Sequence, residues 1–266
     1  MRKLLRCLLA LAALGVLAVS AAKLTAYLSQ GWSAARVQQT ILEQAVRQAE
    51  TAAPPPAPDA QAEPDPPLEP APITVDFAAL KKINSDVAGW LYCQDTPIDL
   101  PIVACADNET YLHHIFDGTP NNTGTLFVDC RNAGDFSDAI TVVYGHNMKN
   151  GTMFGTLTKY KNQDYCDAHP VLWLLTPGGN FQILPAAGCV VPADSAFYAI
   201  GYTGKAACAL VRQAMADSTF AAPEEIAEGD RFLVLSTCSY EFENARFLLI
   251  GRMVRAAPLL TLFIPL

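Results

Sequence analysis

The chain opens with a short basic stretch followed by a long apolar one. Residues 2, 3 and 6 are basic, and an apolar run then extends from Cys7 to Ala22. Sixteen such residues form about 24 Å of helix, slightly short of a hydrocarbon core of about 30 Å. The pattern predicts a signal-anchor or transmembrane segment over residues 1–23, with its basic end in the cytoplasm. A cleaved signal peptide is the alternative, because Ser20-Ala21-Ala22 has the small residues of a cleavage site.

Two further segments separate this run from the rest of the chain. Residues 24–50 contain few helix breakers and a loose apolar stripe, which predicts a helix continuing outside the membrane. Residues 51–72 are rich in Pro, Ala, Asp and Glu, with nine prolines between Pro54 and Pro72. Because such a sequence cannot pack a core and favours extended conformations, it predicts a semi-rigid spacer. The domain beyond it is expected to be held outside the cell on a single-pass anchor.

Short apolar segments follow one another closely over residues 73–255, the predicted folded domain. Eight have the composition and length of strands, namely residues 89–93, 98–105, 124–130, 139–144, 171–176, 181–191, 231–235 and 246–254. Four have a helical pattern, namely residues 77–84, 109–116, 153–160 and 205–218. Since no strand alternates regularly with a long helix, the pattern predicts a mainly β domain with added helices, closed or nearly closed into an eight-stranded barrel. Residues 256–266 form an apolar tail too short to span a bilayer as a helix.

The composition argues against several functional classes of protein. The 266 residues carry a net charge of −8, which argues against a basic nucleic-acid-binding surface. The eight cysteines are scattered without a C-x-x-C pair, so neither a zinc ribbon nor a disulfide-stapled miniprotein is expected. Most of these cysteines are expected to be small core residues, although an exported location leaves disulfides open.

Three places in the domain carry reactive side chains at the ends of apolar strands. His146 follows Val142-Val-Tyr-Gly145, Cys238 follows Phe232-Leu-Val-Leu-Ser-Thr237, and Arg246 begins the last predicted strand. A thiolate is a strong nucleophile toward a carbonyl, and an imidazole can protonate a leaving amine. A guanidinium stabilises an oxyanion. Taken alone, a Cys, a His and an Arg in one chain are weak evidence for a catalytic site.

The motifs around these residues are more specific. Tyr144-Gly-His-Asn-Met-Lys-Asn-Gly-Thr-Met-Phe-Gly155, Ser236-Thr-Cys-Ser-Tyr-Glu241 and Ile83-Asn-Ser-Asp-Val-Ala-Gly-Trp90 closely resemble the sortase family of cysteine transpeptidases, and class B in particular. The resemblance covers roughly residues 75–254. It implies the sortase-like eight-stranded barrel and agrees with the exported, anchored topology.

The resemblance implies roles for individual residues. Cys238 would be the nucleophile, His146 the general acid and base, and Arg246 the group that stabilises the oxyanion or orients the substrate. The substrate groove would be lined by Ser236, Thr237, Tyr240 and Asn147. Alternatively, Asn147 orients His146 or caps a turn. The resemblance implies no cofactor and no metal.

The implied substrates are an exported protein with a C-terminal sorting motif and an amine. The enzyme would form a thioester on Cys238 and transfer the acyl group to an amine of a cell-wall precursor or to a lysine of a pilin. Two alternatives stay open: a cysteine peptidase or amidase using the same residues, and an inert envelope scaffold. The predicted helix at residues 205–218 is short and alanine-rich where class B sortases carry a long helix, so the shape of the groove is open.

Overall fold

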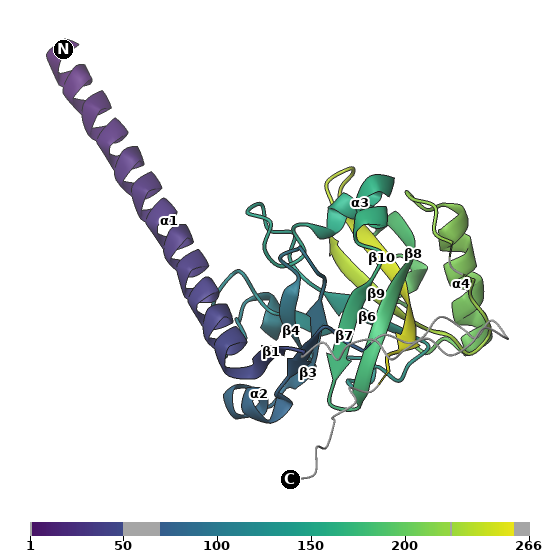
Figure 1. Cartoon of the computed structure of the whole chain (residues 1–266). Coiled ribbons are helices and arrows are strands. Elements are labelled where there is room, and N and C mark those ends of the chain that lie inside the picture. The colour runs from purple at the N-terminus through teal and green to yellow at the C-terminus, as the bar shows by residue number, and fades with distance from the viewer. Residues whose placement is uncertain (1, 50–69, 224, 258–266) are drawn as a thin grey trace, which may run out of the picture.

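The computed structural model describes residues 2–49, 70–223 and 225–257 (Figure 1). Its helices are α1 (Arg2–Ala45), α2 (Phe77–Ile83), α3 (Gln163–Ala168) and α4 (Gly204–Ala216), with short 3-10 helices at Thr110–Leu112, Leu157–Lys161 and Ala196–Tyr198. Its strands are β1 (Val46–Gln48), β2 (Ile73–Val75), β3 (Val87–Tyr92), β4 (Asp99–Val103), β5 (Leu126–Val128), β6 (Ile140–Tyr144), β7 (Leu172–Thr176), β8 (Gly179–Pro192), β9 (Arg231–Cys238) and β10 (Ala245–Arg255).

Strands β3 to β10 close into a barrel in the order β10-β8-β7-β3-β4-β5-β6-β9, which confirms the predicted eight-stranded barrel. Most neighbouring strands are antiparallel, whereas β4–β5 and β6–β9 are parallel pairs. The parallel pairs require long connections. The segment between β6 and β9 therefore contains two further strands and helices α3 and α4.

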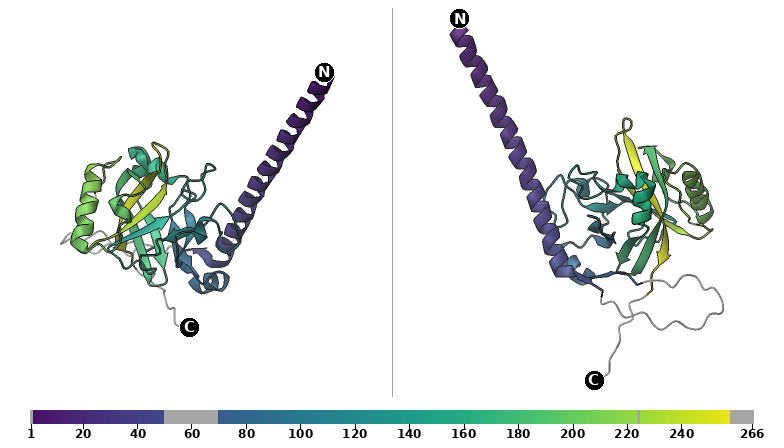
Figure 2. Two further views of the ribbon diagram at one scale, coloured as in Figure 1. Left: turned by 180° about the vertical axis from the view of Figure 1, so that it is seen from behind. Right: turned by 45° about the horizontal axis from the view of Figure 1, so that its top comes forward.

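Strands β6 and β9 are apolar on both faces because each face is covered. Side chains alternate across a strand, so Val143 and Leu235 fill the barrel interior while Val142 and Val234 face outward. Helix α4 covers this outer face with Val211 and other buried residues (Figure 2). A second outer cluster lies under α1 and α2. This double coverage explains the nearly continuous apolar runs in the sequence.

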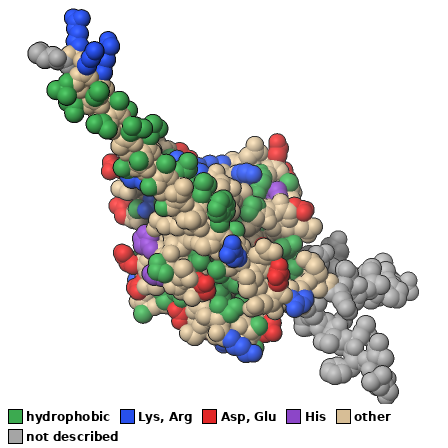
Figure 3. Space-filling view, turned by 90° about the vertical axis from the view of Figure 1, so that its left-hand side faces the viewer, with side chains coloured by type: hydrophobic (Ala, Val, Ile, Leu, Met, Phe, Trp, Pro, Cys, Tyr) green, Lys and Arg blue, Asp and Glu red, His purple; other side chains and the backbone are tan. Residues whose placement is uncertain are grey.

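Helix α1 leaves the barrel as a long rod (Figures 1 and 2). It spans 44 residues, and its most apolar window of 18 residues has no buried residue. By length and composition it is the one helix in the described chain apolar enough to cross a membrane. Figure 3 shows apolar side chains along the projecting part and basic side chains at its tip. The other end packs on the barrel through Ile41, which is 1% exposed.

Several local predictions differ from the structure. The helix expected over residues 24–50 ends at Ala45, because Val46–Gln48 pairs with Ile73–Val75. The helix expected at residues 109–116 is reduced to Thr110–Leu112, with the Asp107 carboxylate accepting the backbone N–H groups of Glu109 and Thr110. The helix expected at residues 153–160 begins only at Leu157, as the 3-10 helix Leu157–Lys161; Met153 has a positive φ of 52°, which a right-handed helix does not accommodate.

Other expectations concern the cysteines and the two outlying segments. All eight cysteines have free thiols, and Cys93, Cys166, Cys189 and Cys208 are buried as small core residues. Cys105 is partly exposed and Cys130 is exposed. Residues 51–69 of the predicted spacer and residues 258–266 of the apolar tail lie outside the described residues.

Candidate active site

The parallel pair β6–β9 brings His146 and Cys238 to the same edge of the barrel. Tyr144 lies opposite Ser236 in the pairing register. His146 and Cys238 each lie two residues further along, at the same level and on the same outward face. The Gly145 N–H donates to the Ser236 carbonyl at 3.1 Å, and this bond continues the pairing beyond the last residue of β6. The two ends are thus held together by main-chain bonds.

Arg246 joins them from the next strand. It lies directly opposite Cys238 in the antiparallel pair β9–β10. Residues that face each other across an antiparallel pair project from the same side of the sheet. The structure therefore places the three residues predicted to be catalytic on one face of the barrel, at the ends of three adjacent strands. All three are partly exposed.

The His146 ring is held by groups from two separate loops. Its Nε2 lies 2.9 Å from the Leu112 carbonyl oxygen. Since a carbonyl can only accept, Nε2 must carry the proton, and Nδ1 is left to accept or release another. Gly124 packs against the ring, because a Cβ there would lie 3.1 Å from His146 Cδ2. Gly124 also has a positive φ of 67°, a conformation that favours glycine.

Asn147 contacts the nucleophile strand, and not the imidazole that it follows. Its side-chain amide donates to the Cys238 carbonyl at 2.9 Å. Thr237 makes a matching link, since its hydroxyl donates to the Gly145 carbonyl at 2.8 Å and its side chain is 2% exposed. Both residues, predicted to line the groove, thus tie the segment around His146 to the end of β9.

Ser236 and Tyr240 flank Cys238 in opposite environments. Ser236 is 1% exposed, and its hydroxyl lies 2.8 Å from the Tyr198 hydroxyl. Tyr240 is 75% exposed on the loop after β9. Burial raises the pKa of Tyr198, a Ser236 hydrogen bond and the Arg246 charge lower it, and the charge of Cys238 raises it. Tyr198 therefore lies within electrostatic reach of both reactive groups.

A second tyrosine extends this cluster to a buried carboxylate. The Tyr144 and Tyr198 rings stack with their centroids 6.0 Å apart, and the Tyr144 hydroxyl donates to Asp129 at 2.8 Å. Asp129 is fully buried and is bound by the Arg131 guanidinium. Burial raises the pKa of Asp129, but hydrogen bonds from Arg131 and Tyr144 outweigh it and lower the pKa to about 2.

Sequence reasoning missed several contact residues of this region. Each of them binds a residue that is distant in the sequence: Leu112 binds His146 over 34 residues, Lys161 binds Ser239 over 78, and Tyr198 binds Ser236 over 38. No sequence motif around these three residues indicates the contact. Glu241, exposed on the loop after β9, accepts hydrogen bonds from Lys161 and Ser239.

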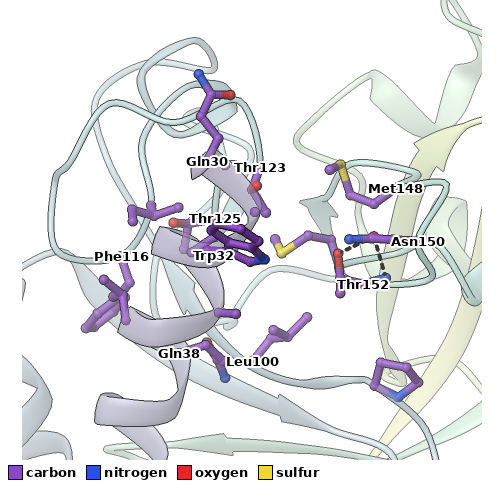
Figure 4. A pocket seen from close by; sticks show the side chains of 18 of the residues that line it. Gln30, Trp32, Gln38, Leu100, Phe116, Thr123, Thr125, Met148, Asn150 and Thr152 are labelled. Atoms are coloured by element: carbon purple, nitrogen blue, oxygen red, sulfur yellow. Dashed lines mark hydrogen bonds between the residues drawn. The ribbon is translucent and has the colours of Figure 1, made fainter. Parts of the chain in front are cut away.

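A cavity of about 700 Å³ lies beside the site, between α1 and the barrel. Figure 4 shows Trp32 and Gln38 of α1 on one side, facing Met148, Asn150 and Thr152 of the loop after His146. Gly124 lines this cavity and also touches the His146 ring. None of the residues predicted to be catalytic lines it.

Known proteins are similar to this chain in sequence and in fold. Sortase B of Listeria monocytogenes is 34% identical over 180 residues, which cover 66% of this chain and 72% of that protein. The solved structure of Clostridium perfringens sortase B superposes with a TM-score of 0.62 and 30% identity, over 67% of this chain and 100% of that one. No family model matches the chain.

Structures of Staphylococcus aureus sortase B are similar in fold. A substrate complex of that enzyme has a TM-score of 0.64 at 22% identity and covers 68% of this chain and 85% of that one. A sortase B complex with triglycine has the same TM-score and identity, and the match covers 68% of this chain and 86% of that one. The motifs, the barrel and the sequence identity to the Listeria protein converge on one conclusion. The chain belongs to the class B sortases, a family of cysteine transpeptidases.

Proposed function

We propose that this enzyme cleaves a C-terminal sorting motif of exported proteins through Cys238 and transfers the acyl group to an amine. The placement of Cys238, His146 and Arg246 on one face, at the ends of three adjacent strands, carries the proposal. A nucleophile, a proton carrier and a fixed positive charge are the three groups that acyl transfer from a peptide bond requires.

The first half of the reaction forms a thioester. The Cys238 thiolate attacks the threonyl carbonyl carbon of the motif, and the carbonyl oxygen becomes an oxyanion beside Arg246. As the C–N bond breaks, His146 Nδ1 donates a proton to the departing amine, and the acyl group remains on sulfur. Because Nε2 stays bonded to the Leu112 carbonyl, only Nδ1 changes its protonation.

The second half reverses these roles. An incoming amine attacks the thioester carbon, His146 Nδ1 takes its proton, and the C–S bond breaks to regenerate the Cys238 thiolate. The energy of the thioester drives amide formation, so no nucleotide or cofactor takes part. The sortase B complex with triglycine supports an amine of the cell-wall cross-bridge type as acceptor. A pilin lysine is the second candidate acceptor.

We further propose that the protein is a single-pass membrane protein with residues 73–255 as an extracellular catalytic domain. Residues 1–23 would cross the bilayer, residues 24–50 would follow outside it, and residues 51–72 would serve as the spacer. The apolar, exposed first part of α1 and the basic residues at its tip support this orientation (Figure 3).

The test uses the full chain in detergent micelles, because the end of α1 packs on the barrel. The protein is incubated with a panel of sorting-motif peptides, with and without triglycine, and products are identified by mass spectrometry. Cys238→Ala is the catalytic control, and Cys130→Ala controls for loss of an exposed thiol. We expect a thioester on the wild type, an amide product that depends on triglycine, and neither in Cys238→Ala.

Other outcomes favour the two alternatives. Hydrolysis that persists with excess triglycine and with lysine-containing peptides as acceptors would favour a cysteine peptidase or amidase. Absence of both thioester and product with every peptide would favour an inert scaffold. Equal losses in Cys130→Ala and Cys238→Ala would contradict the assignment of the nucleophile.

A further inference from the structure

The loop that follows the nucleophile is short and compact. Residues 239–244, here called the β9–β10 loop, connect Cys238 to Ala245. Its backbone closes through a bond from the Ser239 N–H to the Ala245 carbonyl at 2.9 Å, and Asn244 adopts a positive φ of 58°. The base of this loop is therefore bonded directly beside the ends of β9 and β10, which carry Cys238 and Arg246.

A lysine from a distant element holds the β9–β10 loop. Lys161, at the end of the 3-10 helix Leu157–Lys161, donates through Nζ to the Ser239 hydroxyl at 3.1 Å and also to the Glu241 carboxylate. Ser239 in turn donates to the same carboxylate. The three side chains form a closed triangle of hydrogen bonds that spans 80 residues of sequence.

The triangle is placed at the mouth of the barrel. The Ser239 side chain is 5% exposed, and the Lys161 ammonium lies 5.3 Å from the centre of the buried Phe247 ring. Hydrogen bonds from Lys161 and then from Ser239 lower the pKa of Glu241 to about 2. Glu241 is therefore charged at neutral pH and can pair with the Lys161 ammonium.

Lys161 contacts the residues that directly follow Cys238 and Arg246 in the sequence. Ser239 follows Cys238, and Phe247 follows Arg246. On the other side of Cys238, Asn147 already binds its carbonyl. Nucleophilic attack depends on a position accurate to a fraction of an ångström, and hydrogen bonds between charged partners are stronger than those between neutral ones.

We propose that Lys161 and Glu241 are positioning residues, which clamp the β9–β10 loop and thereby orient Cys238 and Arg246 for attack. This inference rests on the proposed function, since its effect is read as turnover of a sorting peptide. It assigns a part in the reaction to two residues that do not themselves touch the reacting atoms.

The test measures kcat and KM for peptide cleavage by the full chain. Lys161→Met keeps most of the side-chain stem and removes the charge, and Glu241→Gln is nearly isosteric. We expect each to lower kcat about tenfold or more with KM changed less than about twofold. Lys161→Arg, which keeps the charge, is expected to retain most of the activity. Lys159→Met on the same 3-10 helix and Glu243→Gln on the same loop are the matched controls and are expected to stay near wild type.

Two further variants separate positioning from general stability. In Lys161→Met/Glu241→Gln the loss should be no greater than in either single variant, because one substitution already breaks the pair. The exchanged pair Lys161→Glu/Glu241→Lys should recover part of kcat. Thermal midpoints and titration of the Cys238 thiol establish that each variant is folded. If Lys161→Met does not fold, the proposal is tested by the kcat of Glu241→Gln and of the exchanged pair.

Three results would overturn the clamp. The first is a wild-type kcat in both single variants. The second is a loss of kcat in the double variant equal to the product of the two single losses. The third is a fall in kcat that is fully explained by a smaller fraction of protein with a titratable Cys238 thiol. An inactive wild type would instead contradict the proposed function, so the two failures can be told apart.

Discussion

Arg246 lies directly opposite Cys238 in the antiparallel pair β9–β10, whose two strands are joined by a loop of six residues. The guanidinium and the thiol therefore belong to one hairpin, and their relative position is set by main-chain hydrogen bonds. His146 comes from a third strand that pairs with β9 in parallel. The segment that carries His146 is tied to β9 by a further main-chain bond, from the Gly145 N–H to the Ser236 carbonyl.

This register leads to a prediction for Arg246. Arg246→Lys keeps a positive charge but loses the planar, forked donor, so we expect kcat/KM for peptide cleavage to fall about 100-fold. Arg255→Lys is the control, because Arg255 lies at the far end of the same strand. Steady-state kinetics with one peptide measure both. Equal activity of Arg246→Lys and the wild type would show that charge alone suffices.

Gly124 should matter more than another glycine of the same conformation. Gly124→Ala would place a Cβ 2.7 Å from the Tyr111 carbonyl oxygen and 3.1 Å from the His146 ring. Gly118 also has a positive φ, of 82°, but a Cβ there meets nothing within 4 Å. Both alanines carry a backbone strain of about 1 kcal/mol.

We expect Gly124→Ala to lose at least about 1 kcal/mol more stability than Gly118→Ala, and only Gly124→Ala to lower kcat. Urea unfolding and peptide turnover measure the two effects. Matching values in both assays would contradict the contact between Gly124 and His146.

Tyr198 is expected to contribute through its hydroxyl. Tyr198→Phe leaves the buried Ser236 hydroxyl without this partner, which costs about 1 kcal/mol of unfolding free energy. Activity should fall several-fold, because Ser236 precedes Cys238 by two residues on the same face. Tyr202→Phe removes a similar bond, to the Ala196 carbonyl, at an exposed position and serves as the control. A larger loss in the control would contradict this assignment.

Asp129 should make stability depend on acid pH. Its pKa falls from an ordinary value of 3.8 to about 2 in the folded state. A lowered pKa stabilises the fold above about pH 4, and this stability is lost as the pH falls toward 2. The loss amounts to about 2 kcal/mol. Urea unfolding at pH 7, 4 and 2.5 should show a steeper decline for the wild type than for Asp129→Asn. Parallel curves would contradict the role of Asp129.

Local sequence patterns predicted many elements and failed where a distant contact intervened. The apolar strands and helix α4 could be predicted from the pattern of apolar and polar residues and from composition. Burial of one face of an element places apolar residues at regular intervals along the sequence. The helix expected over residues 109–116 is limited to Thr110–Leu112, because the carbonyls that would continue it are bonded to distant groups: Tyr111 to the Thr125 N–H and Leu112 to His146. Residues 46–48 became a strand because of a partner that lies beyond the proline-rich segment.

The sequence by itself determined the apolar N-terminal segment, the eight-stranded β domain and the identity of Cys238, His146 and Arg246 as the residues to examine. Burial periodicity and short motifs are local, so they can be recognised along the chain. The tertiary structure decided that β6 pairs in parallel with β9, that Leu112 and Gly124 hold the imidazole, and that Lys161 reaches Glu241. These contacts form only when the barrel closes, because they join groups 22 to 92 residues apart whose choice of partner no local pattern encodes.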